Sequence, residues 1–472
     1  MKHKIFALLM TCVMAFSFCC TAFAESVTNE TETVSTNDTV SNDTSSDDVQ
    51  DTDLTLTAAS AILIDATTGR ILYEKNAYEK QYPASITKLM TILLALENGT
   101  LTDEVTFSHE AVYSIEQGSA HIAIQEGEVL TLEQVLYGII LRSANECANA
   151  AGEFVDGSLE AFAQHMTERA KELGCQNTNF VNANGLFDEN HYTTAYDMAL
   201  IAQALLKNDT YRSMMSNTYY EIPPTNKQTE TRYLYGQHQM LNPNSLYYYE
   251  YAEGGKTGYT VEAQNTLVTY AKKNDTELIA VVLKCSGAQH YVDTKALFDY
   301  GFANYKTAKI LSAGEISQNV EITETYHDKT EVKKTISAVL SQDVYATLPI
   351  DADVSQVQQE IHCDTTKEVP VTAGDALGTV TLTLNGETIG TAELTAETNV
   401  AATTDEERAE ASAQTRNKIL KIIGAVAGGL ILVFLILLGI CRYIGHRRRM
   451  KRRARRKAER KKRLSRHDSF PR

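Results

Sequence analysis

The segment from Pro83 to Gly99 has a helical pattern of apolar and polar positions. Its apolar residues recur every three to four positions, at Leu89, Ile92, Leu93 and Leu96. This period predicts an amphipathic helix that stops at the Asn-Gly pair 98–99. The predicted first turn carries Ser85, and Lys88 lies one turn further along the same face. Free backbone amides and the positive end of the helix dipole face a ligand at such a turn.

Two apolar runs further along the chain border a short polar segment. The runs 135–141 and 148–151 predict two buried helices, with Ser143 and Asn145 in the turn between them. Taken alone, a polar turn between buried helices is an ordinary structural feature.

A third pattern predicts strands. Residues 256–258 precede an alternating stretch at 266–270 and an apolar stretch at 278–283. Together these segments predict an edge strand and a hairpin. An exposed lysine in a turn is the structural alternative for Lys256.

Residues 316–396 change to a β pattern. Val380, Leu382 and Leu384 alternate with polar residues, the Asn-Gly pair 385–386 predicts a tight turn, and Ile389 begins a returning strand. Further strands are predicted at 335–340 and 347–350. A small β-rich domain is therefore expected at 315–396, without recognisable chemistry of its own, followed by a polar stalk at 397–417.

An uncharged apolar stretch at 422–441 is long enough to span a bilayer. Residues 442–472 after it hold 16 Lys and Arg against two acids, so the net charge of −16 divides into +14 for this tail and −30 for the rest. Basic flanks stay in the cytoplasm, which predicts a single-pass membrane helix at 418–441 with the preceding domains outside the cell. The tail beside this anchor is expected to bind anionic lipid, not nucleic acid.

The N-terminus has two compositional segments. Residues 1–24 show the basic start, apolar run and Ala-Phe-Ala end of a secretory signal peptide. A lipoprotein signal at Cys19-Cys20 is disfavoured by the bulky Phe16 and Phe18. Residues 25–53 are acidic, contain no Lys or Arg, and are predicted to be a disordered spacer.

Three short motifs occur in one order: Ser-Ile-Thr-Lys at 85–88, Ser-Ala-Asn at 143–145 and Lys-Thr-Gly at 256–258. Each is weak alone, because a chain this long contains about one or two S-x-x-K matches by chance. Their order, in helix, turn and strand contexts, matches the S-x-x-K, S-x-N, K-T-G set of penicillin-recognising serine acyl-transfer enzymes.

The residue types in these motifs suit acyl transfer. A serine hydroxyl is a poor nucleophile and needs an adjacent base. Lys88 can be that base only if burial or a second cation lowers its pKa, and Lys256 is a candidate for the second cation. The alternative, a helix serine beside a solvated lysine, becomes unattractive once all three motifs are present.

The chain resembles serine D-alanyl-D-alanine carboxypeptidases, the low-molecular-mass penicillin-binding proteins of peptidase family S11. The likeness is strong over 55–305 and weak over 315–395, and beyond the motifs it includes the segments 60–70, 72–76, 184–186, 191–194, 197–200 and 293–302. It implies an α/β (α+β) fold: a serine β-lactamase/DD-peptidase-like domain at 54–306 with an antiparallel sheet flanked by helices. The β-rich domain then serves as a pedestal above the C-terminal transmembrane helix.

The resemblance also implies the reaction and its residues. Ser85 attacks the carbonyl between two terminal D-alanines of a peptidoglycan stem peptide, Lys88 takes its proton, and Ser143 relays a proton to the leaving group. The backbone N–H groups of Ser85 and Tyr259 hold the oxyanion. β-Lactams mimic this substrate and bind covalently. The implied substrate-binding residues are Asn145, Lys256, Thr257, Gly258, Tyr259 and His290.

His290 marks a departure from the family pattern. Family members carry an arginine shortly before the closing helix, thought to help hold the substrate carboxylate, whereas this chain has no arginine between Arg232 and Arg408. Lys256 and Thr257 would then bind most of the substrate carboxylate, or His290 would help to bind it when protonated.

No metal or cofactor is predicted, since the spacing of the cysteines does not suggest zinc. Four cysteines lie in the outer region, at Cys147, Cys175, Cys285 and Cys363. They permit three complete pairings, and free buried thiols are the favoured interpretation.

Two other functions stay open at this point. A class A-like β-lactamase would need a deacylating glutamate in an E-x-x-L-N context, which the sequence lacks. A non-catalytic penicillin-sensing, wall-binding protein would not need intact Ser85, Lys88 and Lys256, although the missing arginine leaves room for it. The sequence does not distinguish carboxypeptidase from endopeptidase preference, the third residue of the peptide, or the oligomeric state.

Overall fold

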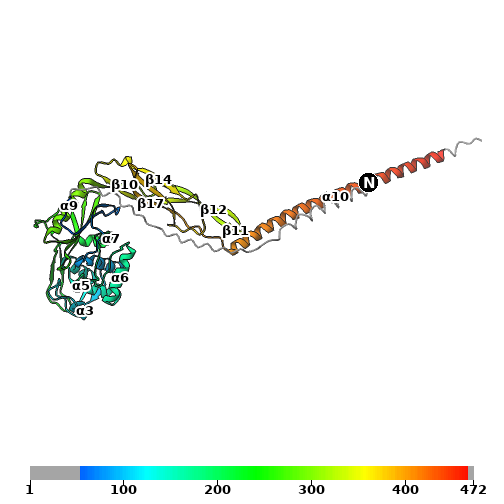
Figure 1. Ribbon diagram of the computed structural model, residues 1–472. Coiled ribbons are helices and arrows are strands. Elements are labelled where there is room, and N and C mark those ends of the chain that lie inside the picture. Colours follow the sequence, from blue (N-terminus) through cyan, green and yellow to red (C-terminus); the bar gives the residue numbers. More distant parts are fainter. Residues whose placement is uncertain (1–53, 466–472) are drawn as a thin grey trace, which may run out of the picture. The chain divides into compact units, whose positions relative to one another are not determined.

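The computed structural model describes residues 54–465 (Figure 1). The predicted signal peptide at 1–24 and acidic spacer at 25–53 lie outside the described residues. The described chain has the predicted mixed α/β architecture, with a β-rich region and an apolar helix after the helix-flanked sheet.

The first folded region is built on a five-stranded antiparallel sheet with the order β2-β1-β9-β8-β7. Its edge strand β7 carries Lys256 and forms a hairpin with β8, which confirms the predicted edge strand and hairpin. The strands are β1 (Ser60–Asp65), β2 (Ile71–Lys75), β7 (Ala252–Thr260), β8 (Gln264–Lys273) and β9 (Thr276–Cys285).

Helices cover both faces of this sheet. Alternate residues of β9 enter two different cores: Ile279 and Val281 join the core of the larger helical layer, while Ala280 and Val282 pack with α9 (Gln289–Asn304). Because successive strand residues point to opposite faces, a strand covered on both sides is apolar throughout and does not alternate.

The larger helical layer consists of α2 (Lys88–Asn98), α3 (His109–Tyr113), α4 (Leu132–Arg142), α5 (Asn145–Asp156), α6 (Leu159–Glu172), α7 (Ala195–Leu206) and α8 (Asp209–Met215). The two helices predicted around Ser143 are thus confirmed as α4 and α5, but Asn145, expected in the turn between them, is instead the first residue of α5. Smaller elements complete the region: β3 (Glu104–Thr106) with β4 (Val129–Thr131), β5 (Tyr219–Ile222) with β6 (Arg232–Tyr235), and the 3-10 turn η2 (Gln239–Leu241).

The predicted helix at Ser85 ends at Asn98 as expected but begins later. Residues Ala84–Thr87 form the 3-10 turn η1, and α2 starts at Lys88. Ala84 has a left-handed φ of 51°. Its carbonyl oxygen would lie 2.0 Å from a Cβ placed on Gly185, so only glycine fits there. Tertiary packing, not the helical period, therefore shapes the turn that presents Ser85.

The β-rich region follows α9 and has its own apolar core. β10 (Tyr305–Leu311) pairs with β13 (Val344–Pro349), and a six-stranded sheet has the order β14-β16-β17-β12-β11-β15. Asn385 and Gly386 adopt φ values of 55° and 91° at the predicted tight turn. The remaining elements are β11 (Ser317–Tyr326), β12 (Lys329–Leu340), η3 (Val354–Gln356), β14 (Gln358–Cys363), β15 (Thr366–Glu368), β16 (Ala376–Leu384) and β17 (Glu387–Ala396).

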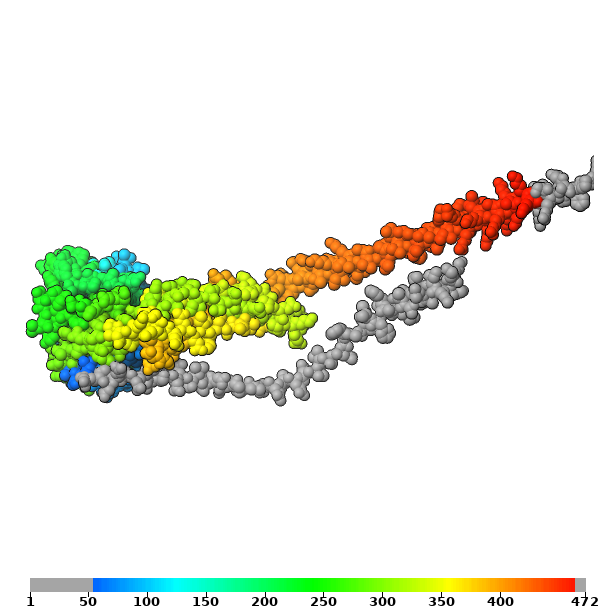
Figure 2. Space-filling model, turned by 90° about the horizontal axis from the view of Figure 1, so that it is seen from above, coloured from blue at the N-terminus to red at the C-terminus, as the bar shows by residue number. Residues whose placement is uncertain are grey.

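The last element, α10 (Asp405–Ser465), is one uninterrupted helix, drawn in orange to red in Figures 1 and 2. It includes most of the predicted stalk at 397–417, which is helical from residue 405 onward. Within the described residues, the helix Asp405–Lys462 is the one that is long and apolar enough to cross a membrane.

Candidate active site

The three sequence motifs meet around the amine of Lys88, which is completely buried. Its Nζ lies 3.0 Å from Ser85 Oγ and 2.7 Å from Asn145 Oδ1, and it also contacts the backbone oxygen of Asn184. An ammonium has three N–H donors, and after losing a proton it keeps two donors and gains a lone pair. With the two fixed oxygens accepting those hydrogens, the lone pair is left to face the Ser85 hydroxyl.

The surroundings of Lys88 favour its neutral form. Burial lowers the pKa of Lys88 well below 10.5, and the charge of Lys256 lowers it further. The carboxylate of Glu146 acts in the opposite direction. A lysine held in this way can accept a proton from Ser85, which is the property that the sequence hypothesis requires.

Ser143 is held in an uncommon backbone conformation where α4 ends. Its φ is 56°, a left-handed value that is rare for residues with side chains and is often found at functional sites. Its Oγ lies 3.0 Å from Lys256 Nζ, which also donates to the Thr257 carbonyl oxygen at 2.8 Å. Burial lowers the pKa of Lys256 to about 7. Ser143 and Lys256 thus form a second pair of hydroxyl and amine beside the first.

Strand β7 approaches the nucleophile turn through Gly258. A Cβ on this residue would lie 2.4 Å from Thr266 Oγ1 and 2.9 Å from the backbone nitrogen of Ser85. Thr266 Oγ1 donates to the Pro83 carbonyl oxygen at 2.8 Å, which fastens the sheet to the turn. The Ser85 N–H therefore lies against β7 directly before Tyr259, whose side chain is 63% exposed.

His290 is not joined to this network by any hydrogen bond among the described residues. Its Nδ1 lies 3.0 Å from the Gly287 carbonyl oxygen at the start of α9, and its ring packs against Tyr291. Burial lowers the pKa of His290 below its ordinary value of 6.5. Thr257, in contrast, adjoins Lys256 on the same strand.

Two residues contribute to the site in ways that no motif marks. Asn184 acts through its backbone oxygen on Lys88, and its sequence signal is the neighbouring Gly185 that packs on the nucleophile turn. His191 Nδ1 accepts the Val181 N–H at 3.1 Å, so Nε2 carries the hydrogen and donates it to Thr87 Oγ1 at 2.8 Å. Burial lowers the pKa of His191 to about 4, which keeps this link neutral.

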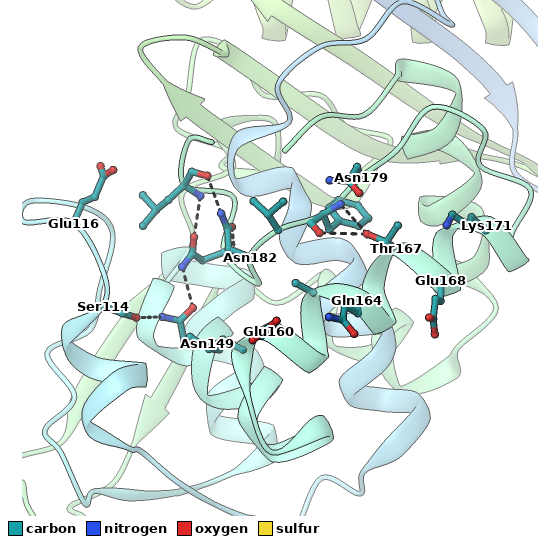
Figure 3. A pocket seen from close by; sticks show the side chains of 16 residues that line it. Ser114, Glu116, Asn149, Glu160, Gln164, Thr167, Glu168, Lys171, Asn179 and Asn182 are labelled. Carbon is teal, nitrogen blue, oxygen red and sulfur yellow. Dashed lines mark hydrogen bonds between the residues drawn. The ribbon is translucent and has the colours of Figure 1, made fainter. Parts of the chain in front are cut away.

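A cavity of about 750 Å³ is lined by Asn149 and Asn182, which Figure 3 labels, and by Asn184. Asn184 Nδ2 donates to Asn149 Oδ1 at 2.9 Å, and Asn149 Nδ2 donates to Ser114 Oγ at 3.1 Å. The cavity therefore shares Asn184 with the Lys88 network. Its charged lining residues are Glu116, Glu160, Glu168 and Lys171.

Residues 54–462 contain no group of three or more His, Cys, Asp or Glu side chains arranged to hold a metal ion. Cys147, Cys175 and Cys285 are free and buried, in agreement with the predicted thiols. Cys363 is also free but only half-buried.

Comparison with known proteins finds two family models. One, described as D-alanyl-D-alanine carboxypeptidase, matches residues 45–287, and the other, described as penicillin-binding protein 5, C-terminal domain, matches residues 305–402.

Individual relatives are similar over most of the chain. D-alanyl-D-alanine carboxypeptidase DacF of Bacillus subtilis (strain 168) is 34% identical over 364 residues, which cover 76% of this chain and 88% of the relative. D-alanyl-D-alanine carboxypeptidase DacA of Escherichia coli (strain K12) is 29% identical over 71% of this chain and 81% of the relative. The crystal structure of penicillin binding protein 5 from Haemophilus influenzae is similar with a TM-score of 0.61 and 27% identity, over 74% of this chain and 98% of that one.

Proposed function

We propose that this chain, which belongs to the peptidase S11 family of D-alanyl-D-alanine carboxypeptidases, removes the terminal D-alanine of peptidoglycan pentapeptides through an acyl-enzyme on Ser85. The observation that carries this proposal is the buried Lys88 amine, with its Nζ 3.0 Å from Ser85 Oγ. The side-chain oxygen of Asn145 and the backbone oxygen of Asn184 hold the amine, so its lone pair is directed at the Ser85 hydroxyl.

In the acylation step, neutral Lys88 takes the proton of Ser85 as Oγ attacks the carbonyl carbon between the two D-alanines. The developing oxyanion is bound by the backbone N–H groups of Ser85 and Tyr259. The close approach of Gly258, the residue before Tyr259, to the Ser85 nitrogen supports this pairing. Each such donor is typically worth about 3 kcal/mol in the transition state.

Collapse of the tetrahedral intermediate breaks the peptide bond and requires a proton for the leaving amine. Ser143 donates it and is reprotonated through Lys256, whose Nζ lies 3.0 Å from Ser143 Oγ. Lys256 and Thr257 bind the free carboxylate of the leaving D-alanine, and a bound carboxylate favours the charged form of Lys256. Asn145 orients the peptide while its Oδ1 holds Lys88.

Deacylation returns the enzyme to its starting state. Before this step the proton that Lys88 took from Ser85 is released and Lys256 regains the proton it supplied, so that Lys88 is again neutral. A water molecule then attacks the ester carbonyl of the acyl-enzyme, Lys88 accepts the water proton, and Lys88 passes that proton to Ser85 Oγ as the oxygen leaves. β-Lactams enter the same path, because opening of the lactam ring acylates Ser85 but leaves the departing group attached.

One experiment separates the proposed function from its alternatives. The full chain in detergent is incubated with a fluorescent penicillin and, separately, with a peptide ending in D-Ala-D-Ala. A carboxypeptidase forms a lasting label on Ser85 and releases D-alanine. Rapid turnover of penicillin instead indicates a β-lactamase, and labelling without D-alanine release indicates a sensor.

The membrane topology belongs to the same proposal. The apolar part of α10 at 418–441 anchors the chain, with the catalytic domain outside the cell and the basic tail at 442–472 inside, where it meets anionic lipid. Externally added protease should therefore cleave the catalytic domain of intact cells while a tag at the C-terminus stays protected. Loss of the tag under these conditions would contradict the orientation.

His290 provides a test of carboxylate recognition. The sequence places its titration near about 6–7, but burial lowers the pKa of His290, so the ring is neutral at pH 7 and gains charge only in a more acidic range. The contribution of His290 should therefore lower KM for a D-Ala-D-Ala peptide only below pH 7, whereas loss of charge on Lys256, whose pKa burial lowers to about 7, should raise KM above that pH in every variant that keeps Lys256.

His290→Arg should lower KM about tenfold at pH 7–8 and remove the dependence below pH 7, because a charged hydrogen bond to carboxylate is worth about 1.5–3 kcal/mol. KM profiles that coincide for the two forms would show that His290 does not contact the substrate carboxylate. Thermal unfolding of both forms shows whether the larger side chain is accommodated.

A further inference from the structure

The mechanism above makes no use of a buried carboxyl group that lies next to it. Glu146 follows Asn145 on the first turn of α5, and its side chain is 1% exposed. Lys88 and Lys256, at 0% and 3%, are equally buried. The site thus contains two buried amines and one buried acid.

Glu146 differs from the buried acids that serve the fold. Its Oε1 accepts the Ile122 N–H at 2.7 Å, but its Oε2 has no partner among the described residues. Glu128, in comparison, accepts from both Nη groups of Arg232, and Asp197 accepts from two backbone amides and Thr178. A buried carboxylate oxygen without a donor is costly, so packing alone does not explain an acid at position 146.

The charges around Glu146 come from three directions. Lys88 on α2 is the cation with which it interacts across the site, and Lys256 on β7 faces Lys88 in turn. His121 lies directly before Ile122 and also acts on Glu146. Cys147 is the next residue on α5, and the pKa of its thiol, which burial raises, is also influenced by Lys88 and by the Arg232–Glu128 pair. Burial raises the pKa of Glu146 itself, while the Ile122 N–H and His121 act in the opposite direction. Among the catalytic groups, Lys88 is the one whose pKa the carboxylate of Glu146 raises.

We propose that Glu146 is a positioning residue that supplies a buried counter-charge to Lys88 and so sets the pH above which Lys88 works as a base. This inference rests on the proposed function. Its geometric basis is the first turn of α5, which delivers Asn145 Oδ1 to Lys88 at 2.7 Å and, one residue later, the orphan carboxylate oxygen.

The counter-charge has a chemical purpose. Burial and Lys256 together lower the pKa of Lys88, while Glu146 raises it. An amine whose pKa is too low is neutral at every working pH but is also a weak base, and general-base catalysis is most effective when the pKa lies near the operating pH. The carboxylate of Glu146 therefore limits how far burial and Lys256 together lower the pKa of Lys88.

Glu146→Gln tests this inference, since glutamine keeps an oxygen for the Ile122 N–H, has nearly the same shape and removes the charge, with an NH2 group in place of the second oxygen. The pH dependence of kcat/KM on a D-Ala-D-Ala peptide, and of the rate of penicillin acylation, is measured for the full chain in detergent. The acid limb should move about one pH unit lower in the variant. The plateau rate should fall several-fold, because Lys88 becomes a weaker base.

Two further variants make the test specific. Glu153→Gln removes a carboxylate from the same helix, one that accepts from Ser108 Oγ at 2.8 Å, and should leave the acid limb in place. Glu146→Asp keeps the charge but withdraws it by one bond length, so its acid limb should lie between those of the wild type and Glu146→Gln. If the glutamine variant does not fold, the aspartate variant alone carries the comparison.

An acid limb that stays in place in Glu146→Gln, with the rate lowered equally at all pH values, would overturn the inference and leave Glu146 a structural residue. The same conclusion would follow if Glu153→Gln moved the limb as far. A wild type that neither binds penicillin covalently nor releases D-alanine would instead contradict the proposed function, so the two failures are distinguishable.

Discussion

Ser85→Ala is expected to abolish both covalent labelling by penicillin and release of D-alanine. The substitution removes the oxygen that forms the ester and leaves the rest of the site unchanged. The other serine hydroxyl of the site, on Ser143, lies 3.0 Å from Lys256 Nζ and so belongs to the second pair, not to Lys88. Loss of the nucleophile in serine hydrolases lowers kcat by about 10⁶, which places the variant below detection in an ordinary assay.

The fold should survive this change, because Ser85 is half-buried and the only side-chain hydrogen bond described for it is the one with Lys88. Mass spectrometry of penicillin-treated protein and thermal unfolding are the two measurements. Ser213→Ala, which changes an exposed serine on α8, is the matched control and should label fully. A stoichiometric label on Ser143 or on any other serine of the Ser85 variant would disprove the assignment of the nucleophile.

The fold shows which features local sequence determines. The apolar period of α2 and its stop at Asn98 depend on neighbouring residues, and both were predictable. The start of α2 was not, because the 3-10 turn at Ser85 is shaped by the approach of Gly185 to Ala84 from a distant part of the chain. The strand β9 was predictable from its apolar stretch at 278–283, but the reason for that stretch, burial of both faces by α9 and the larger helical layer, became apparent only in three dimensions.

The site shows the same division between local and long-range information. The motifs name the side chains that meet at Lys88, because acyl transfer needs those residue types. They do not reveal the Asn184 carbonyl, since a backbone oxygen has no residue signature. Nor do they reveal that Glu146 keeps an oxygen without a partner. Likeness to a family assigned His290 a position, but its burial and its bond within the Gly287 turn become apparent only in three dimensions.

Lys88→Arg is expected to lower acylation by about 10²–10⁴, the usual contribution of a positioned general base. The change preserves the positive charge and much of the length of the side chain. It removes the ability to be neutral, because a guanidinium remains protonated at any pH that the protein tolerates. Wild-type acylation should rise with pH as Lys88, whose pKa burial has lowered, loses its proton. The arginine variant should show no such rise.

Rates of penicillin labelling across the pH range provide the measurement, with Lys272→Arg, an exposed lysine of β8, as the matched control. Thermal unfolding is needed beside it, since arginine must fit a site in which Lys88 is fully buried between Asn145 and the Asn184 carbonyl. A folded variant within about tenfold of the wild type would mean that another group accepts the Ser85 proton. Lys256 would then be the next candidate, because it is the other buried amine of the site and burial lowers its pKa to about 7.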